Sequence, residues 1–383
     1  MEKLLNVSSS PHVRDKSSTK SIMRDVCIAL IPATLVGIGN FGVRALLVIL
    51  TTCVSTVLAE YVWQRLMKQK VTTYDFSALL TGLLLALNLP ATLPLWMCVI
   101  GGVFAIIIVK QLFGGLGQNF MNPALGARCF LMLSFSSAMT NSFAIPKGNK
   151  IWGGYQATLD AVSSATPLMQ VKEATCQADL ATTLKDMFLG TTWGTIGETS
   201  ALALLIGGIY LIAKKIIDWK IPVIYIATFT VFTLIYSCAT GAYVPVFMEW
   251  CGGGLMLGAF FMATDYVTSP ITSKGKVLYA ILLGLLTGLF RFFGESAEGV
   301  SFAIIIGNLL NELPFQRHLE RRAKSMSSEK KERSFVIDAI ILCVITLVLG
   351  GILAGVYTMT KGTIAQRQAD TDSKACEKVI ASV

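Results

Sequence analysis

Apolar runs of about 20 residues recur along this chain, and they decide what kind of protein it forms. Such a run makes a helix that can cross a hydrocarbon core of roughly 30 Å. The chain has 383 residues, of which 14% are charged, whereas a soluble globular protein has about 25%. These charged residues are too few to cover a water-facing surface, so the surface must face lipid. We therefore predict an all-α integral membrane protein.

Eleven spans are predicted from these runs. Full-length spans are expected near 24–40, 42–62, 92–112, 198–214, 221–240, 276–293 and 335–357, and shorter, Gly- or Pro-interrupted ones near 76–90, 119–138, 250–265 and 298–314. The first ten form two groups of five around a long polar loop. Because each group has an odd number of spans, the second group crosses the membrane in the opposite direction to the first. Both groups have the same order of long and short spans. We therefore expect an inverted repeat with discontinuous helices.

This interpretation divides the chain into four parts. They are a first five-helix repeat at 1–138, a polar loop at 139–196, a second five-helix repeat at 197–325, and a linker, extra helix and polar tail at 326–383.

The placement of positive charge predicts the orientation. With a cytoplasmic N-terminus, Lys and Arg gather in the cytoplasmic segments and most densely at 317–333, as the positive-inside rule requires. The loop 139–196 is then on the outer side. The net charge of +9 is explained by this orientation, and no basic, solvated domain for nucleic-acid binding is visible.

Several kinds of site are disfavoured. The chain has two histidines, His12 and His318, which argues against a histidine-based metal site or a Ser-His-Asp triad. The nine cysteines include no CxxC pair, and most lie in apolar runs as small buried residues. Cys176 and Cys376 lie in polar stretches and could pair if both are outside. There is no P-loop and no GxGxxG after a strand.

The loop contains the segment DAVSSATPL at 160–168. On composition it is an ordinary Ser/Thr-rich loop. Its spacing resembles the D-x-x-S-G-A-T flavinylation motif, in which the threonine oxygen forms a phosphoester with FMN. Small neighbours leave the hydroxyl of Thr166 accessible to a transferase, and Pro167 stiffens the chain after it. Ser164 stands where glycine is more usual.

Two further segments place polar groups at broken spans. GGLGQNFMNPA at 114–124 is either a tight helix-entry turn or the wall of a polar pocket, because broken backbone at membrane depth is tolerated only inside protein. Asn119 and Asn122 would share one helical face, and their amides suit the donors and acceptors of a flavin ring. Asp265, at the end of the span 250–265, either ends a helix or faces a cofactor or ion. Arg128 is expected to be paired internally, with its partner open.

Four segments together resemble one family. GGLGQNFMNPALGARCF (114–130), DAVSSATPL (160–168), ATDYVTSP (263–270) and EGVSFAIIIGNLLNELPFQRH (298–318) are similar to the D-type membrane component of Rnf complexes, which is related to the B-type component of the sodium-pumping NADH:quinone reductase. The resemblance covers about residues 1–325. The short N-terminal region favours the Rnf type. The span near 335–357 looks like the membrane anchor of the G-type component, without the threonine motif that follows it there.

The resemblance implies a fold, cofactors and partners. It implies a ten-helix inverted repeat in a bacterial-type cell membrane, FMN on Thr166, and a non-covalent riboflavin held by Asn119, Asn122 and Asp265. It implies partner proteins of the A, B, C, E and G types and a flavin transferase. In this family electrons cross the membrane through such flavins while ions are translocated, and Rnf complexes link ferredoxin and NAD.

The leading hypothesis is therefore an electron-carrying membrane subunit that does not itself act on NAD or ferredoxin. The alternatives are an inverted-repeat secondary transporter or channel, which uses the same broken helices, and a scaffold subunit in which Asp265 and the two asparagines are replaceable. Thr166 discriminates, because a transporter has no need of a flavinylation motif. The sequence leaves sodium and protons equally open.

Overall fold

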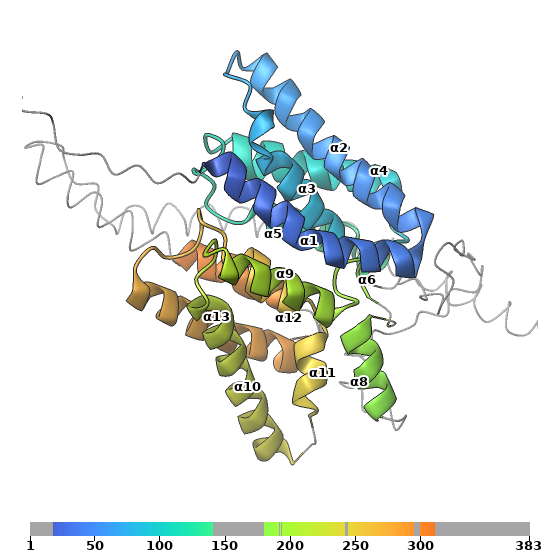
Figure 1. The fold of residues 1–383 in the computed structure, drawn as a ribbon, viewed down its shortest axis with the longest axis vertical. Helices are drawn as coiled ribbons and strands as arrows, with labels where there is room; N and C mark the ends of the chain where they lie inside the picture. Colours follow the sequence, from blue (N-terminus) through green and yellow to red (C-terminus); the bar gives the residue numbers. More distant parts are fainter. Residues whose placement is uncertain are drawn as a thin grey trace, which may run out of the picture. The chain divides into compact units, whose positions relative to one another are not determined.

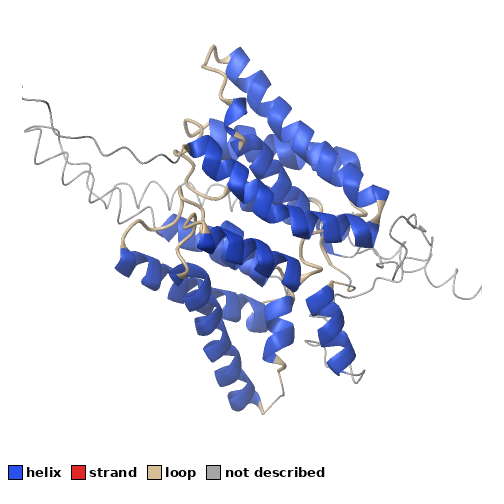
Figure 2. Ribbon diagram, viewed as in Figure 1, coloured by secondary structure: helices blue, strands red, loops and turns tan. Residues whose placement is uncertain are grey.

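The computed structural model describes residues 18–140, 180–190, 192, 194–241, 244–294 and 299–310. Thr166, both histidines, Cys176, Cys376 and the predicted span at 335–357 lie outside these residues. All of the described residues belong to the unit Met1–Gln316. They form helices joined by loops and no strand (Figure 2).

The first group of helices begins with two long ones, α1 (Thr19–Phe41) and α2 (Val43–Leu66), and then becomes irregular. A short turn η1 (Thr73–Asp75) leads into α3 (Ser77–Leu87). The fourth helix starts as α4 (Leu95–Val103) and continues as the π-helical segment η2 (Phe104–Gln111). α5 (Pro123–Ser134) and the short α6 (Ser136–Thr140) complete the group (Figure 1).

The second group repeats this irregularity. After α8 (Leu180–Leu189) come α9 (Ala201–Ala213) and α10 (Lys220–Thr240). The next helix is broken into α11 (Val246–Cys251), α12 (Leu255–Leu257) and the π-helical η3 (Gly258–Met262). α13 (Ser273–Phe293) and a helix at Val300–Leu310 follow.

Each predicted span within the described residues overlaps a helix. Four helices, α1, α2, α10 and α13, are long and apolar enough to cross a membrane, and five shorter apolar helices lie at Ser77–Leu87, Leu95–Gln111, Pro123–Ser134, Ala201–Ala213 and Val300–Leu310 in the described part of the chain. The spans expected to be full-length near 92–112 and 198–214 are among the shorter ones; the second begins at Ala201, because Ser200 caps α9. α8 was not expected, because it lies within the segment predicted as a polar loop.

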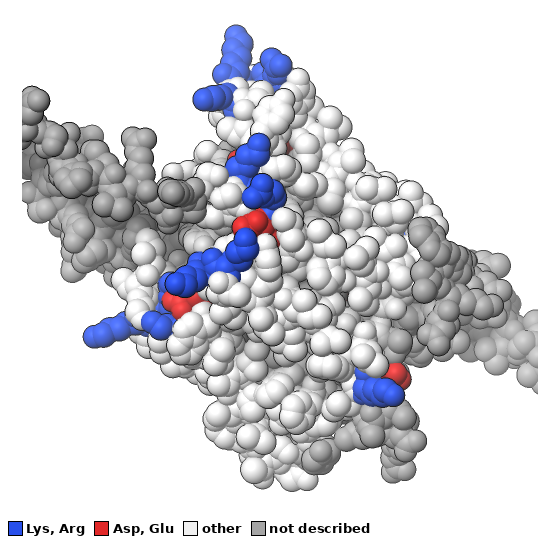
Figure 3. Space-filling view, in the orientation of Figure 1, with Lys and Arg blue, Asp and Glu red and all other residues white. Residues whose placement is uncertain are grey.

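The outer surface of these helices is apolar. Leu35, Leu133 and Ile235 are each more than 60% exposed, at 63%, 78% and 63%. Exposed Lys and Arg instead gather along one edge (Figure 3), where α1 begins, α2 ends and α13 begins, with a separate small group at α8. Apolar sides with charge confined to the helix ends are what a lipid environment requires.

The two groups pack against each other through α1 and α9. Glycine allows this close approach, since a Cβ on Gly207 of α9 would lie 2.1 Å from the carbonyl oxygen of Ala29 in α1. Small residues at such contacts let helix backbones pack closely in a membrane. Within the groups, α2 packs along α3 and α4, and α10 packs along α13.

Gly207→Ala should therefore lower the thermal unfolding midpoint of the protein in detergent. The added methyl group forces α1 and α9 apart, and overpacking of this kind costs about 1–3 kcal/mol. Gly39→Ala in α1 is the control, because nothing lies within 4 Å of a Cβ at Gly39. Fluorescence-monitored melting of both variants checks this, and equal midpoints would contradict the close packing described above.

Candidate functional site

A cavity lies where the irregular parts of the two groups face each other. It is open on one side, and the empty space between its lining atoms, counted together with that open side, is about 710 Å³. Met23, Leu80, Leu116 and Phe261 supply apolar walls. The polar lining residues are Ser77, Thr81, Lys110, Asn119, Asn122, Thr264, Asp265 and Tyr266.

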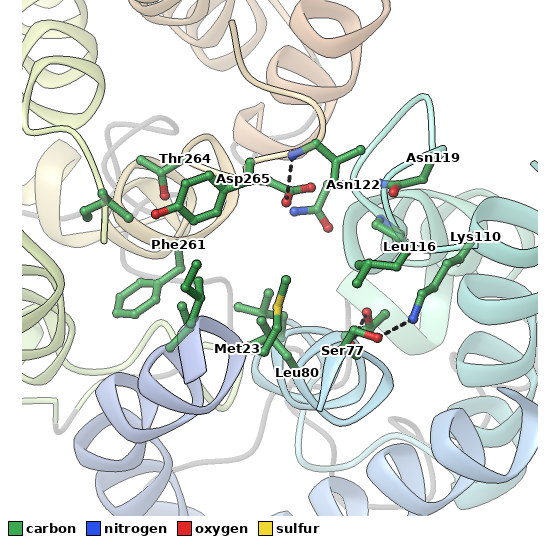
Figure 4. Close-up of a pocket in the computed structure, with 18 of the residues that line it drawn as sticks. Met23, Ser77, Leu80, Lys110, Leu116, Asn119, Asn122, Phe261, Thr264 and Asp265 are labelled. Carbon is green, nitrogen blue, oxygen red and sulfur yellow. Dashed lines mark hydrogen bonds between the residues drawn. The ribbon is translucent and has the colours of Figure 1, made fainter. Parts of the chain in front are cut away.

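The cavity brings together the three residues that the sequence singled out for a buried flavin. Asn119 and Asn122 come from the first group and Asp265 from the second, and all three line the same space (Figure 4). The expectation of a shared helical face is wrong, because Asn119 lies in the loop before α5 and Asn122 is its N-cap. The convergence arises from the loop geometry.

Glycines shape that loop. Gly114, Gly115 and Gly117 have φ values of +114°, +94° and +90°, a region that residues with a Cβ rarely adopt. The loop then enters α5 at Asn122, whose side-chain oxygen accepts a hydrogen bond from the backbone N–H of Ala124 at 3.0 Å. Pro123 at the first helical position suits this start. The amide nitrogen of Asn122 lies 3.5 Å from the carbonyl oxygen of Met262 in the other group.

Asp265 follows η3 in a short turn. Its carboxylate accepts long hydrogen bonds from the backbone N–H of Val267 at 3.5 Å and from the hydroxyl of Thr268 at 3.4 Å. Asp265 thus follows a helix end and also lines the cavity; the prediction that it faces a cofactor or ion stays a prediction. A carboxylate bound this weakly by its own turn has acceptor capacity left for a ligand N–H.

A buried lysine forms another wall of the cavity. The ammonium of Lys110, in η2, donates to Glu60 Oε1 of α2 at 2.8 Å and to Ser77 Oγ at 2.7 Å. Gln111 Nε2 donates to the same Glu60 oxygen at 2.7 Å. Lys110 and Glu60 are 2% and 1% exposed. Burial of both charges is tolerated because each is paired and hydrogen-bonded.

Arg128 has an internal partner, as the sequence led us to expect. Its Nη2 lies 3.5 Å from Glu198 Oε1, and its Nη1 donates to Asn88 Oδ1 at 2.6 Å. The backbone N–H groups of Ile196 and Gly197 donate to the carbonyls of Leu89 and Leu87 at 3.0 and 2.8 Å. The segment around Glu198 thus closes the C-terminal end of α3.

A third buried pair holds the break in the second group. Arg291 of α13 donates to Glu249 Oε2 at 2.8 Å and to the carbonyl oxygen of Gly252 at 3.0 Å. Glu249 lies in α11, and Gly252 lies in the gap between α11 and α12. The guanidinium therefore supplies a hydrogen-bond donor to a carbonyl oxygen at the break in the helix.

Sequence reasoning missed Lys110, Glu60, Ser77 and Glu198. The available signal was a charged residue inside an apolar run, which applies to Glu60 and Lys110 as it did to Arg128. No group of three or more His, Cys, Asp or Glu residues suited to a metal ion occurs in the described part of the chain. The site therefore offers amide, hydroxyl, carboxylate and ammonium groups between apolar walls.

Removing one partner of the central ion pair should be costly. Glu198→Ala takes away the carboxylate that faces the buried guanidinium of Arg128, and breaking such a pair costs about 3–5 kcal/mol. Asp218→Ala is the control, because Asp218 and Lys276 pair at 3.1 Å while 27% and 24% exposed, a setting worth about 1 kcal/mol or less. Melting in detergent should separate the two variants; similar losses would argue against a structural role for the buried pair.

Comparison with known proteins gives consistent matches along the chain. Residues 6–323 match the model of the NQR2, RnfD, RnfE family, and residues 326–379 match that of the RnfG N-terminal region. The chain is 47% identical over 330 residues to the D component of the Na(+)-translocating ferredoxin:NAD(+) oxidoreductase complex of Acetobacterium woodii, covering 86% of this chain and 98% of the relative.

Two other relatives are similar over nearly the same length. The D component of the proton-translocating ferredoxin:NAD(+) oxidoreductase complex of Clostridium ljungdahlii is 44% identical over 319 residues, covering 81% of this chain and 93% of the relative. The D component of the ion-translocating oxidoreductase complex of Aliivibrio salmonicida is 35% identical over 333 residues, covering 79% and 93%.

Proposed function

This chain belongs to the NQR2, RnfD, RnfE family, and from that premise we propose that it is the electron-transferring membrane subunit of an ion-translocating ferredoxin:NAD oxidoreductase complex. Its multi-pass membrane character follows from this membership and from the four long apolar helices. The observation that carries the proposal is the 47% identity across nearly the whole of a D component of such a complex. A sodium-translocating and a proton-translocating relative are almost equally similar, so the likeness favours neither ion.

The proposed cofactors are FMN, bound through a phosphoester to Thr166, and a non-covalent riboflavin in the cavity. The polar lining of the cavity fits a riboflavin ring, because the amides of Asn119 and Asn122, the carboxylate of Asp265 and the ammonium of Lys110 offer both donors and acceptors beside apolar walls. When bound, such a flavin supplies reversible electron transfer. The protein's contribution is to bind the ring, fix its orientation and exclude water.

We further propose that the two groups are inverted repeats of five helices each, giving ten transmembrane helices before residue 325. The buried ion pairs support this. Lys110 lies late in the fourth helix of the first group and donates to Ser77, the first residue of α3. Arg291, late in the fourth long element of the second group, binds Gly252 just before α12. Each cation is paired with a glutamate, Glu60 or Glu249.

The proposed orientation places the N-terminus in the cytoplasm and the loop 139–196 outside a bacterial cell membrane. The band of Lys and Arg at one edge supports it, because positive charge is retained on the cytoplasmic side. The cavity opens near this edge, since the first turns of α1 at Ile22 and Met23 line it.

In the proposed function other proteins of the complex, of the A, B, C, E and G types, handle NAD and ferredoxin. A flavin transferase installs the FMN. Residues 326–379, which match the RnfG N-terminal region, would add a G-type anchor to this D-type protein, after the parts 1–138, 139–196 and 197–325.

Replacing Thr166 should abolish covalent flavin. The full chain and Thr166→Ala, both produced with a flavin transferase, are compared by intact mass and by in-gel fluorescence after denaturation in SDS. We expect one FMN mass and a fluorescent band that are absent from the variant. A dark native band of unmodified mass would remove the support for a redox role, and the secondary transporter or channel would then be the better hypothesis.

Asp265→Ala should lower the amount of non-covalent flavin at least several-fold, because the variant loses a buried acceptor of the ring's N–H, while Thr166 stays modified. Flavin released by mild acid from the purified protein is quantified beside the covalent band. Asp218→Ala, a carboxylate removed from the cytoplasmic edge rather than the cavity, is the control. Unchanged released flavin in Asp265→Ala would remove Asp265 from the site.

A further inference from the structure

Lys110 is the one basic residue among those that line the cavity in the described part of the chain. Its acidic partner Glu60 does not line the cavity. The pair is neutral overall, but Lys110, its positively charged member, is the one that lines the cavity. Arg128 and Arg291 are as deeply buried, yet neither lines this space.

The ammonium has a donor left over. It carries three N–H bonds, of which one goes to Glu60 Oε1 at 2.8 Å and one to Ser77 Oγ at 2.7 Å. Among the described residues its Nζ makes no third hydrogen bond. In a low-dielectric site such a donor is costly unless a ligand uses it.

The surroundings hold the ammonium in one place. The hydroxyl of Ser77 donates to Asp75 Oδ1 at 2.6 Å, so its lone pairs face Lys110. Glu60 Oε1 also accepts from Gln111 Nε2 at 2.7 Å, which fixes the carboxylate. Ser77, Asn122 and Asp265 meet around the same space, and the amine end of Lys110 reaches the Ser77 wall (Figure 4).

Resting on the proposed function, we propose that Lys110 donates its third N–H to an acceptor on the riboflavin ring and offsets the negative charge that the ring gains with an electron. No bond forms or breaks on Lys110: the electron would come from a second, reduced flavin of the proposed complex, and the fixed ammonium would face the charge that the ring gains. Glu60 and Ser77 are positioning residues. Because the cation interacts more strongly with the reduced ring than with the oxidised one, it acts by differential binding.

The test is a redox titration of the full chain purified in detergent, in a Thr166→Ala background so that only non-covalent flavin contributes. Lys110→Met keeps an unbranched side chain that is one heavy atom shorter and removes its charge. We expect flavin to be retained and the preference for the reduced ring to fall at least about tenfold, which is about 59 mV more negative for one electron. Lys110→Arg should keep the potential near that of the parent.

Lys276→Met is the matched control, because it removes a lysine at the charged edge that does not line the cavity. The double variant Lys110→Met with Glu60→Gln covers the case in which an unpaired Glu60 prevents folding, since both charges are then removed together. Its potential should shift in the same direction. Loss of flavin from Lys110→Met with retention in Lys110→Arg would also support the contact.

The outcomes separate the two proposals. Flavin present in Lys110→Met and in the double variant, with the parent potential, overturns the role of Lys110 and leaves the proposed function standing. A parent protein with no non-covalent flavin overturns the Lys110 proposal together with the riboflavin part of the proposed function, while the covalent FMN on Thr166 in the full chain decides the redox role.

Discussion

The absence of water inside a bilayer is the constraint on which this structure depends. Every charge and every interrupted helix within the hydrocarbon region has to find its partner in protein. Three buried ion pairs meet that requirement: Lys110 with Glu60, Arg128 with Glu198, and Arg291 with Glu249. Each lies where a helix is broken or begins. The third pair also serves the backbone, because Arg291 donates to the carbonyl oxygens of Gly252 and Gly253 in the gap between α11 and α12.

The cavity is a consequence of those breaks. In the first group the loop between η2 and α5 carries Asn119, in the second group the turn after η3 carries Asp265, and both residues line the same space. The π-helical ends η2 and η3 contribute as well, because η2 brings Lys110 to the wall and η3 ends beside Asp265. Segments of this kind are often found at functional sites. The charged wall and the amide wall thus follow from one structural device used twice.

The sequence predicted the helices well, because apolar runs and their interruptions are local signals. It also selected Asn119, Asn122 and Asp265, which the fold brings to one cavity. It failed where the answer is tertiary. Nothing in the spacing shows that Glu60 faces Lys110, or that Glu198 closes the end of α3 beside Arg128. The shared helical face of the two asparagines was wrong because positive-φ glycines direct that loop, and Thr166 lies outside the described residues.

In the proposed function α5 connects the cavity, in sequence, with the segment that contains Thr166. Asn122 begins this helix at the cavity, and α5 has 12 residues, which is about 18 Å of helix. Arg128 in its middle is held by Asn88 of the first group at 2.6 Å and by Glu198, just before α9, at 3.5 Å. Both groups thus hold the helix that begins at the cavity, and a fixed position of this kind is what an electron-carrying site requires of its protein.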